Sequence, residues 1–393
     1  MPNVKRIEAM ISDYPSIPVM DLHYLAMKFH GVRDKDTEAG RATWNLINAK
    51  DLFHITFGTS EDDSPYEIHD HKTITYDGGE LPFRIDFVER MPAKNGRYYY
   101  FRHPNYLTPS LDDRLVLNLN FKRQCFSCDF CQYSLYKHKP DVSEEEGFEM
   151  IEFNGDSFSD VDEIAIVTGC FGSSRRTAEH LEKVIDFSTQ RGFKGKLFYM
   201  GFELSEPTDM ERVVNAVQRN NLTGFRVAYT VEMFSNRERM MKGRKSLQDL
   251  NEVHASLKNI KEQGVSELEY TYIPGLDGMN EFKKGAETLA DVAKPHICIF
   301  RPWRKGQRLE LLHPEYAEAG PVSLAEMRTF YEDLYHGPIT GNNLANLWPF
   351  PLDRIDSRWV SGKIVGEMPN NRYWEGGRDP RPNKCGIEQG IGK

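Results

Sequence analysis

No run of 18 consecutive apolar residues occurs in this chain of 393 residues, so no membrane-spanning helix is expected. A basic excess is also lacking, because 59 acidic residues outnumber 50 Lys and Arg residues and leave a net charge of −9. Nucleic acids and anionic membrane surfaces attract basic proteins, so neither is expected as a partner. The N-terminus lacks the apolar core and cleavage site of a signal peptide. A cytoplasmic location is therefore expected.

Cysteine is scarce, with six residues in the whole chain, so the disulfide framework of small secreted proteins is not expected. Three of the six lie close together in the sequence QCFSCDFCQYSLYK at residues 124–137. Cys125, Cys128 and Cys131 have the C-x2-C-x2-C spacing of a bacterial ferredoxin run. Leu135 stands where that run has its fourth thiolate. The run therefore offers three metal ligands and leaves one coordination position open.

The spacing alone leaves four interpretations of these cysteines. A structural zinc site needs four ligands, and no second C-x2-C pair is present to complete one. An electron-transfer cluster also needs four thiolates. The cysteines could also be structural and bind no metal. In the fourth interpretation, three thiolates hold a [4Fe–4S] cluster whose remaining iron is open to a substrate-like ligand, as in catalytic metal sites.

An alternation of strands and helices begins near residue 115. Short runs of β-branched and aromatic residues, bounded by Gly or Pro and separated by helical patterns, predict parallel strands. The six runs are RLVLNLNF (114–121), DEIAIVTG (162–169), GKLFYMGF (195–202), GFRVAYTVE (224–232), SELEYTYIPG (266–275) and KPHICIFRP (294–302). They predict an α/β protein with either a doubly wound sheet or a full or partial (β/α) barrel. Both place ligand sites at the carboxyl ends of the strands, and the cysteines follow the first strand directly.

Amphipathic segments between these strands predict the intervening helices. The first of them places Ala178, Leu181, Val184 and Ile185 on one face. Capping boxes are expected at three helix starts, because their side chains bind the free amides of a first turn. The three are TDME at 208–211, SLQD at 246–249 and SLAE at 323–326.

The chain divides into three parts by pattern. Residues 1–110 predict an N-terminal α+β extension with a helix at 19–31 and a hairpin at 72–88. Residues 111–305 contain the six strand–helix units. Residues 306–393 predict a helix and then an irregular C-terminal tail, rich in Asn, Gly, Pro and Trp.

The three-cysteine loop after the first strand and the six strand–helix units resemble the radical S-adenosylmethionine (SAM) superfamily, over about residues 112–305. The resemblance implies a partial (β/α)6 TIM-like barrel. It also implies that Cys125, Cys128 and Cys131 bind a [4Fe–4S] cluster whose open iron chelates SAM. Reductive cleavage of SAM would give a radical, expected to be 5′-deoxyadenosyl, that acts on a small-molecule or amino-acid-like substrate. An external donor such as a flavodoxin or ferredoxin would reduce the cluster.

The resemblance further implies contacts with SAM at the strand ends. Phe130 stands where the family has an aromatic or hydrophobic residue before its third cysteine. The segment VTGCFGS at 167–173 stands at the glycine-rich turn that meets the methionyl amine. A ribose contact is expected from Glu232, with Ser235 as a second choice, and Lys242 and Arg244 are candidates for the methionyl carboxylate.

The adenine is expected between the turn YIPGLDG at 272–278 and Phe300, at the ends of the fifth and sixth strands. Substrate-pocket candidates near the strand ends are Glu203, Tyr272, Arg301 and Trp303. The implied cofactor-binding residues are Phe130, Thr168, Gly169, Cys170, Glu232, Ser235, Arg244, Ile273, Gly275 and Phe300.

Two features depart from the family pattern. The family usually has C-x3-C-x2-C, and the first gap here is one residue shorter. Its usual Gly-Gly-Glu is Gly169-Cys170-Phe171 in this chain, so the acidic residue is missing. The short gap leaves open a cleavage toward a 3-amino-3-carboxypropyl radical. Outside the family, the alternative is a non-catalytic zinc or iron–sulfur binding module.

Overall fold

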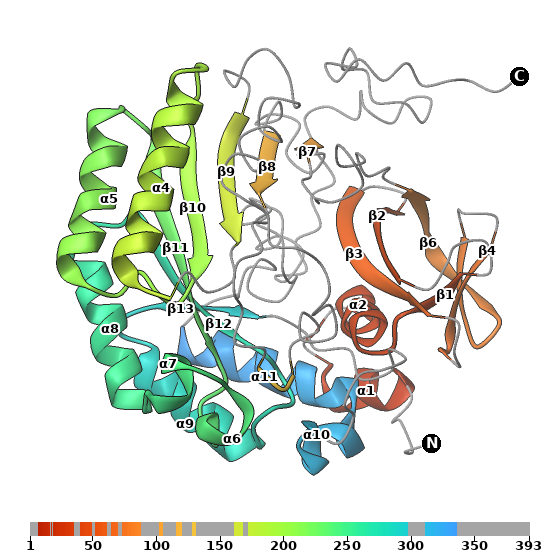
Figure 1. Ribbon diagram of the computed structural model, residues 1–393. Helices are drawn as coiled ribbons and strands as arrows, with labels where there is room; N and C mark the ends of the chain where they lie inside the picture. The colour runs from red at the N-terminus through yellow and green to blue at the C-terminus, as the bar shows by residue number, and fades with distance from the viewer. Residues whose placement is uncertain are drawn as a thin grey trace, which may run out of the picture.

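The computed structural model describes residues 7–15, 17, 19–34, 40–48, 52–60, 64–69, 73–87, 102–104, 115–119, 128–130, 161–167, 172–297 and 311–335. A seven-stranded sheet forms the centre, in the order β13-β12-β11-β10-β9-β8-β7 (Figure 1). Six of its strands run parallel, and β7 (Arg102–Pro104) pairs antiparallel with β8. The parallel strands are β8 (Leu115–Leu119), β9 (Val161–Val167), β10 (Lys196–Gly201), β11 (Gly224–Glu232), β12 (Glu267–Tyr272) and β13 (Lys294–Ile297).

The six parallel strands coincide with the six predicted runs, so the predicted α/β architecture is confirmed. They are neighbours in chain order without a reversal. Helical crossovers of one hand then place the helices on one face, which rules out the doubly wound alternative. This strand order is the one expected for the wall of a (β/α) barrel, and the described sheet is open.

The helices pack on one another in chain order along that face (Figure 1). The five longest are α4 (Ser174–Thr189), α5 (Pro207–Arg219), α8 (Leu250–Glu262), α9 (Met279–Leu289) and α11 (Pro321–Leu334). The four apolar residues predicted to share one face of α4 are all buried. They join a core with Ile164, Leu197 and Val227 of the sheet, so this apolar stripe fixes α4 to the strands.

All three predicted capping boxes are wrong. Helix α8 begins after Asp249, whose Oδ1 accepts the Glu252 amide at 2.8 Å while Glu252 Oε2 accepts the Asp249 amide at 2.9 Å. The box is therefore DLNE at 249–252, three residues later than predicted, and Leu247 is 79% exposed. Helices α5 and α11 have no side-chain cap and carry proline in the first turn, where its fixed φ and missing amide are tolerated.

The N-terminal part contains both predicted elements, the helix and the hairpin. Its helices are α1 (Ile7–Asp13) and α2 (Val19–His30), and its strands are β1 (Val32–Asp34), β2 (Gly40–Asn48), β3 (Leu52–Ser60), β4 (Tyr66–His69), β5 (Thr73–Tyr76) and β6 (Gly79–Phe87). The strands close into a small barrel that the sequence did not predict. Helix α2 contacts α11, which joins the two parts (Figure 1). Within the described residues, no helix is long and apolar enough to cross a membrane.

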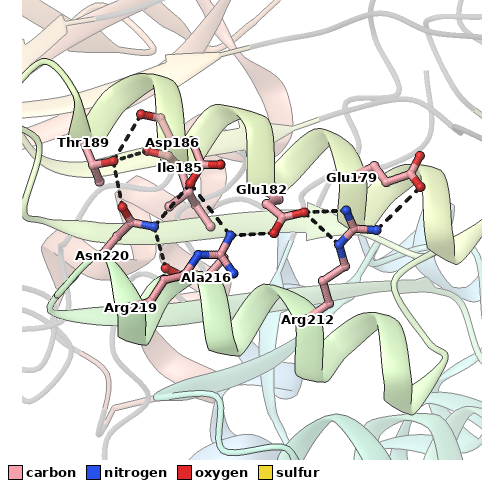
Figure 2. A network of polar contacts seen from close by, with 9 residues as sticks. All are labelled: Glu179, Glu182, Ile185, Asp186, Thr189, Arg212, Ala216, Arg219 and Asn220. Carbon is pink, nitrogen blue, oxygen red and sulfur yellow. Dashed lines mark hydrogen bonds and ion pairs between the residues drawn. The ribbon is translucent and has the colours of Figure 1, made fainter.

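Figure 2 shows a network of ion pairs that joins α4 to α5. Glu182 Oε2 accepts a hydrogen bond from Arg212 Nε at 2.7 Å, and its other oxygen accepts one from Arg219. The hydrogen bond from Arg219 is the main cause that lowers the pKa of Glu182. Glu182 is thus the central carboxylate of the network between α4 and α5.

Replacing Glu182 with Gln is expected to lower the free energy of unfolding by about 1 kcal/mol in urea at low salt, and by less at high salt. Glu179→Gln is the control, because its carboxylate is 39% exposed and lies 3.5 Å from Arg212. Glu179→Gln is expected to lower the free energy of unfolding by less than Glu182→Gln does. Equal costs would contradict the central role of Glu182.

Candidate functional site

Acidic residues follow three adjacent strands of the parallel sheet. Glu203 comes two residues after β10, Glu232 ends β11, and Asp277 lies in the turn after β12. Glu203 and Asp277 are buried, and Glu232 is half-buried. Because the carboxyl ends of parallel strands share one edge of the sheet, these carboxylates gather where α/β proteins place their ligands.

The described part of the cysteine loop, residues 128–130, lies against the loops that follow β11 and β12. The Asp129 amide donates to the carbonyl of Met240 at 2.9 Å, and Lys242 Nζ donates to Asp129 Oδ2 at 3.3 Å. Cys128 and Phe130 are buried in one apolar cluster. Its other members are Met233, Met240, Met241 and Leu276, with Ile273 and Leu311 packed against it. Cys125 and Cys131 lie outside the described residues.

The loop after β11 is anchored to the turn after β12 through Asp277. Asp277 Oδ2 accepts the Phe234 amide at 2.8 Å, and Oδ1 accepts the amide and hydroxyl of Ser235 at 3.0 and 2.6 Å. Burial raises the pKa of Asp277, although these hydrogen bonds act in the opposite direction. The Phe234 ring also stacks on Tyr272 at 4.8 Å. The hydroxyl of Ser235, a predicted ribose contact, therefore serves this anchor.

Asp277→Ala is expected to lower the free energy of unfolding by about 2 kcal/mol, because it removes the acceptor of two buried or half-buried amides. Ser235→Ala removes only the hydroxyl donor and is expected to cost about 1 kcal/mol or less. Urea denaturation followed by circular dichroism measures both. An Asp277→Ala cost no larger than that of Ser235→Ala would show that the anchor is unimportant.

Glu232 has an unusual backbone at the end of β11. Its φ is 72°, and the register between β11 and β12 shifts between Thr230 and Glu232. A left-handed residue other than glycine is costly and persists where its surroundings hold it. The Glu232 carbonyl accepts the Ile273 amide at 2.9 Å, and its Oε2 accepts Lys245 Nζ at 2.6 Å. Such strain at a strand end is a feature that clusters at ligand sites.

Two cations near this loop were missed by sequence reasoning. Arg237 in α6 (Arg237–Met240) is buried and donates to the carbonyls of Val231 and Met233 at 2.8 and 2.6 Å. Burial is the main cause that lowers its pKa. In α7 (Arg244–Leu247), the side chain of Lys245 is only 11% exposed, whereas that of Arg244 is 61% exposed. Lys245 is therefore the cation of α7 beside Glu232.

Arg244, which the sequence favoured for the methionyl carboxylate, lies at the rim. Its Nη2 is 3.8 Å from Glu206 Oε1, and both side chains are more than half exposed. Lys242, the other residue considered there, pairs with Asp129 of the cysteine loop. The side chains of Lys242, Arg244 and Lys245 are 43%, 61% and 11% exposed, so the loop conformation decides which of the three cations faces inward.

The turn after β9 is held by Glu203. Thr168, Gly169 and Cys170 lie outside the described residues, and the description resumes at Gly172. The Gly172 amide donates to Glu203 Oε1 at 2.9 Å. Ser173 then caps α4 by accepting the Arg176 amide. Glu203, in the loop after β10, thus supplies a carboxylate to the turn after β9, where the sequence lacks the acidic residue of the family pattern.

Gly275 occupies a position that only glycine fits. Its φ is +96°, and a Cβ there would lie 2.5 Å from the ring of Tyr316. Tyr316 belongs to α10 (Pro314–Ala319), and the Gly275 carbonyl accepts the His313 amide at 2.7 Å. Packing alone therefore explains the glycine predicted beside adenine. Phe300, its predicted neighbour, lies outside the described residues, as do Arg301 and Trp303.

Metal-ligand geometry is only partly described. Within the described ranges, no three His, Cys, Asp or Glu side chains are grouped to hold a metal ion. Two of the three predicted ligands, Cys125 and Cys131, are not in those ranges. The three-cysteine site therefore stays a prediction, supported by the position of Cys128.

Neither protein-family models nor curated protein sequences match this chain. In structure it is similar to HydG, a maturase of the [FeFe]-hydrogenase, with 13% identity and a TM-score of 0.42 over 63% of this chain and 56% of HydG. It is similar to methylornithine synthase (PylB), with 13% identity and a TM-score of 0.40 over 56% of this chain and 63% of PylB. It is also similar to coproporphyrinogen III oxidase (HemN) from Escherichia coli, a radical SAM enzyme, with 11% identity and a TM-score of 0.38 over 55% of this chain and 52% of HemN. The chain thus spans less than two thirds of the length of each of these proteins.

Proposed function

We propose that the protein is a radical SAM enzyme in which Cys125, Cys128 and Cys131 hold a [4Fe–4S] cluster and SAM completes its coordination. One observation carries the proposal: the segment 128–130 packs against the loops that leave the carboxyl ends of β11 and β12. This edge of a parallel sheet is where ligand sites occur. The three-cysteine run and the site of a small-molecule cofactor then coincide.

The surroundings of Cys128 suit an iron–sulfur cluster. Its thiol is buried among Met233, Met240, Met241 and Leu276, which exclude water. Burial and hydrogen bonding to sulfur set the potential of such clusters, so a dry pocket is part of the required environment. Three thiolates leave one iron open to a ligand, which distinguishes a catalytic from a closed site.

The chain's own residues would bind and orient SAM. Glu232 is the candidate acceptor for the ribose hydroxyls, and its left-handed backbone at the end of β11 supports this assignment. Lys245 replaces Arg244 as the candidate for the methionyl carboxylate, because it is the less exposed cation. Phe130 and Ile273 provide an apolar wall beside the cysteine loop. When bound, the reduced cluster would supply one electron to the sulfonium of SAM.

The substrate is proposed to be a small molecule or an amino-acid-like compound. The net charge of −9 supports neither a nucleic-acid nor a membrane partner. A flavodoxin or ferredoxin would reduce the cluster, and a cytoplasmic location would suit such a donor.

Anaerobic reconstitution tests the proposal. We expect about four irons per chain and, after addition of dithionite, conversion of SAM to 5′-deoxyadenosine. Formation of 5′-methylthioadenosine instead would indicate the 3-amino-3-carboxypropyl radical that the short first gap leaves open. A protein that binds only zinc, or that binds iron without cleaving SAM, would overturn the proposal.

A further inference from the structure

The segment between β11 and α8 carries Glu232 and Lys245, the candidates for the ribose and the methionyl carboxylate, and it has little regular structure. Its helices α6 and α7 span four residues each, which is too short for a helix to be stable by itself. Its backbone has a positive φ at Glu232, Asn236 and Gly243, of 72°, 48° and 66°. Side-chain contacts must therefore fix where Lys245 lies relative to Glu232.

Arg237 of α6 makes such contacts from the middle of the segment. It is 4% exposed, and its Nη1 donates to the carbonyls of Val231 and Met233, on either side of Glu232, at 2.8 and 2.6 Å. Its Nη2 donates to the carbonyl of Lys245 in α7 at 3.1 Å. The planar guanidinium thus joins the end of β11 to α7 through hydrogen bonds in fixed directions.

The β11 side of this connection is held independently of Arg237. Strand β11 pairs with β12, and the Glu232 carbonyl accepts the Ile273 amide at 2.9 Å just beyond the paired residues. The Phe234 amide, one residue further along, donates to Asp277 at 2.8 Å. The hydrogen bond from Arg237 to α7 therefore ties a short, irregular element to a part of the chain that the sheet already holds.

The side chain of Lys245 returns toward the same strand end. Its Nζ donates to Glu232 Oε2 at 2.6 Å and lies 5.9 Å from the ring centre of Phe202, which follows β10. Burial is the main cause that lowers the pKa of Arg237, and the charge of Glu232 acts in the opposite direction. Because both terminal nitrogens of Arg237 donate to backbone carbonyls, its contribution is to hold the backbone of Lys245.

We propose that Arg237 is a positioning residue, which holds Lys245 beside Glu232 where its ammonium can pair with the methionyl carboxylate of SAM. A binding residue keeps its place only when a second set of contacts supports it, and Arg237 provides such a contact for α7. Because it concerns the binding of SAM, the inference rests on the proposed function. The expected consequence is a loss of affinity for ligands that carry the carboxylate.

Isothermal titration calorimetry of the full chain, as purified and after cluster reconstitution, measures the affinity for S-adenosylhomocysteine and for adenosine, which lacks the carboxylate. Arg237→Lys keeps the charge without the planar fork, and it is expected to weaken S-adenosylhomocysteine binding roughly tenfold. Adenosine binding should weaken about twofold or less. Arg328→Lys is the control, because Arg328 of α11 is also a buried arginine, 2% exposed and bonded to Glu332 at 3.0 Å. It is expected to lower stability in urea and to keep both affinities.

A double-mutant cycle tests whether Arg237 acts through Lys245. Lys245→Gln is expected to weaken S-adenosylhomocysteine binding roughly tenfold, and adding Arg237→Lys should then weaken it by about twofold or less. An affinity unchanged by Arg237→Lys or by Lys245→Gln would overturn the positioning role. So would an equal loss in Arg328→Lys, or the same effect of Arg237→Lys in both backgrounds.

Cleavage of SAM by the unaltered, reconstituted chain reports separately on the proposed function. If that chain cleaves SAM while the cycle shows no coupling, the positioning role fails and the function stands. If the unaltered chain binds no S-adenosylhomocysteine and cleaves no SAM, both are overturned.

Discussion

Replacing Cys128 with serine is expected to abolish cluster binding and to lower the rate of SAM cleavage by roughly 10³-fold or more. Serine offers a hard, protonated hydroxyl where the iron requires a soft thiolate. Loss of an outer hydrogen-bond partner of a metal ligand already costs about 10- to 100-fold, and loss of a ligand itself costs more. Iron content and 5′-deoxyadenosine formation after anaerobic reconstitution measure the effect.

Cys385→Ser is the matched control, because Cys385 lies in the C-terminal tail, far along the sequence from the three-cysteine run. It is expected to keep the iron content and SAM turnover of the original protein. Circular dichroism should show that both variants remain folded. A Cys128→Ser protein that still binds about four irons, or an equal loss in Cys385→Ser, would contradict the proposed ligand set.

Replacing Glu269 with glutamine is expected to lower the free energy of unfolding by about 3–5 kcal/mol. Arg226 is 2% exposed, and among its ion pairs with described residues the one to Glu269 is the shortest, at 2.9 Å. The neutral amide leaves the buried guanidinium without that charge. Glu267→Gln is the control, because Glu267 is 35% exposed and lies 3.7 Å from Arg226 Nε. Its cost should be about 1 kcal/mol or less.

The same pair predicts how stability depends on pH. The pKa of Glu269 is about 2 in the folded protein, below its ordinary value of 4.5. The folded state then binds fewer protons than the unfolded state, so the contribution is present above pH 4.5 and is lost as the pH falls toward 2. Glu269→Gln should lack this acid-dependent loss. Urea denaturation at several pH values tests this, and equal pH slopes for both proteins would contradict it.

Burial of His23 causes a second loss of stability in acid, which begins at a higher pH than the loss due to Glu269. Burial lowers its pKa from 6.5 to about 4, so the folded state resists its protonation. Its stabilising contribution is complete above pH 6.5 and is lost as the pH falls toward 4. Burial lowers the pKa of His30 to about 4 as well, so the two histidines lose their contributions together, mostly in a different pH range from Glu269.

Most of the parallel strands could be predicted from local sequence because they are runs of β-branched and aromatic residues that end near Gly or Pro. The helix starts could not be predicted in the same way. Several neighbouring segments have a side chain that can cap a helix, followed three residues later by an acidic residue. SLQD and DLNE overlap at Asp249, and only the packing of α8 selects the second. Proline in the first turn marks the true starts of α5 and α11 more reliably than the predicted capping boxes.

The three-cysteine site stays a prediction, and only residues 128–130 of its loop are described, packed against the loops after β11 and β12. Asp277 acts through hydrogen bonds to residues 42 and 43 positions away. No local pattern reveals such partners. The buried face of β12 left a readable signal, because Glu267, Glu269 and Thr271 alternate with Leu268, Tyr270 and Tyr272. That alternation predicts one polar and one apolar face for β12, and the polar face carries the ion pairs with Arg226.

Electron paramagnetic resonance of the reduced, reconstituted protein tests the central claim most directly. A cluster held by three cysteines has one iron open to SAM, so adding SAM is expected to change the spectrum of the reduced [4Fe–4S] cluster. The change should be absent in Cys128→Ser, which lacks the cluster, and unaffected in Cys385→Ser. A spectrum that stays the same when SAM is added, or a reconstituted protein without a [4Fe–4S] signal, would contradict the claim.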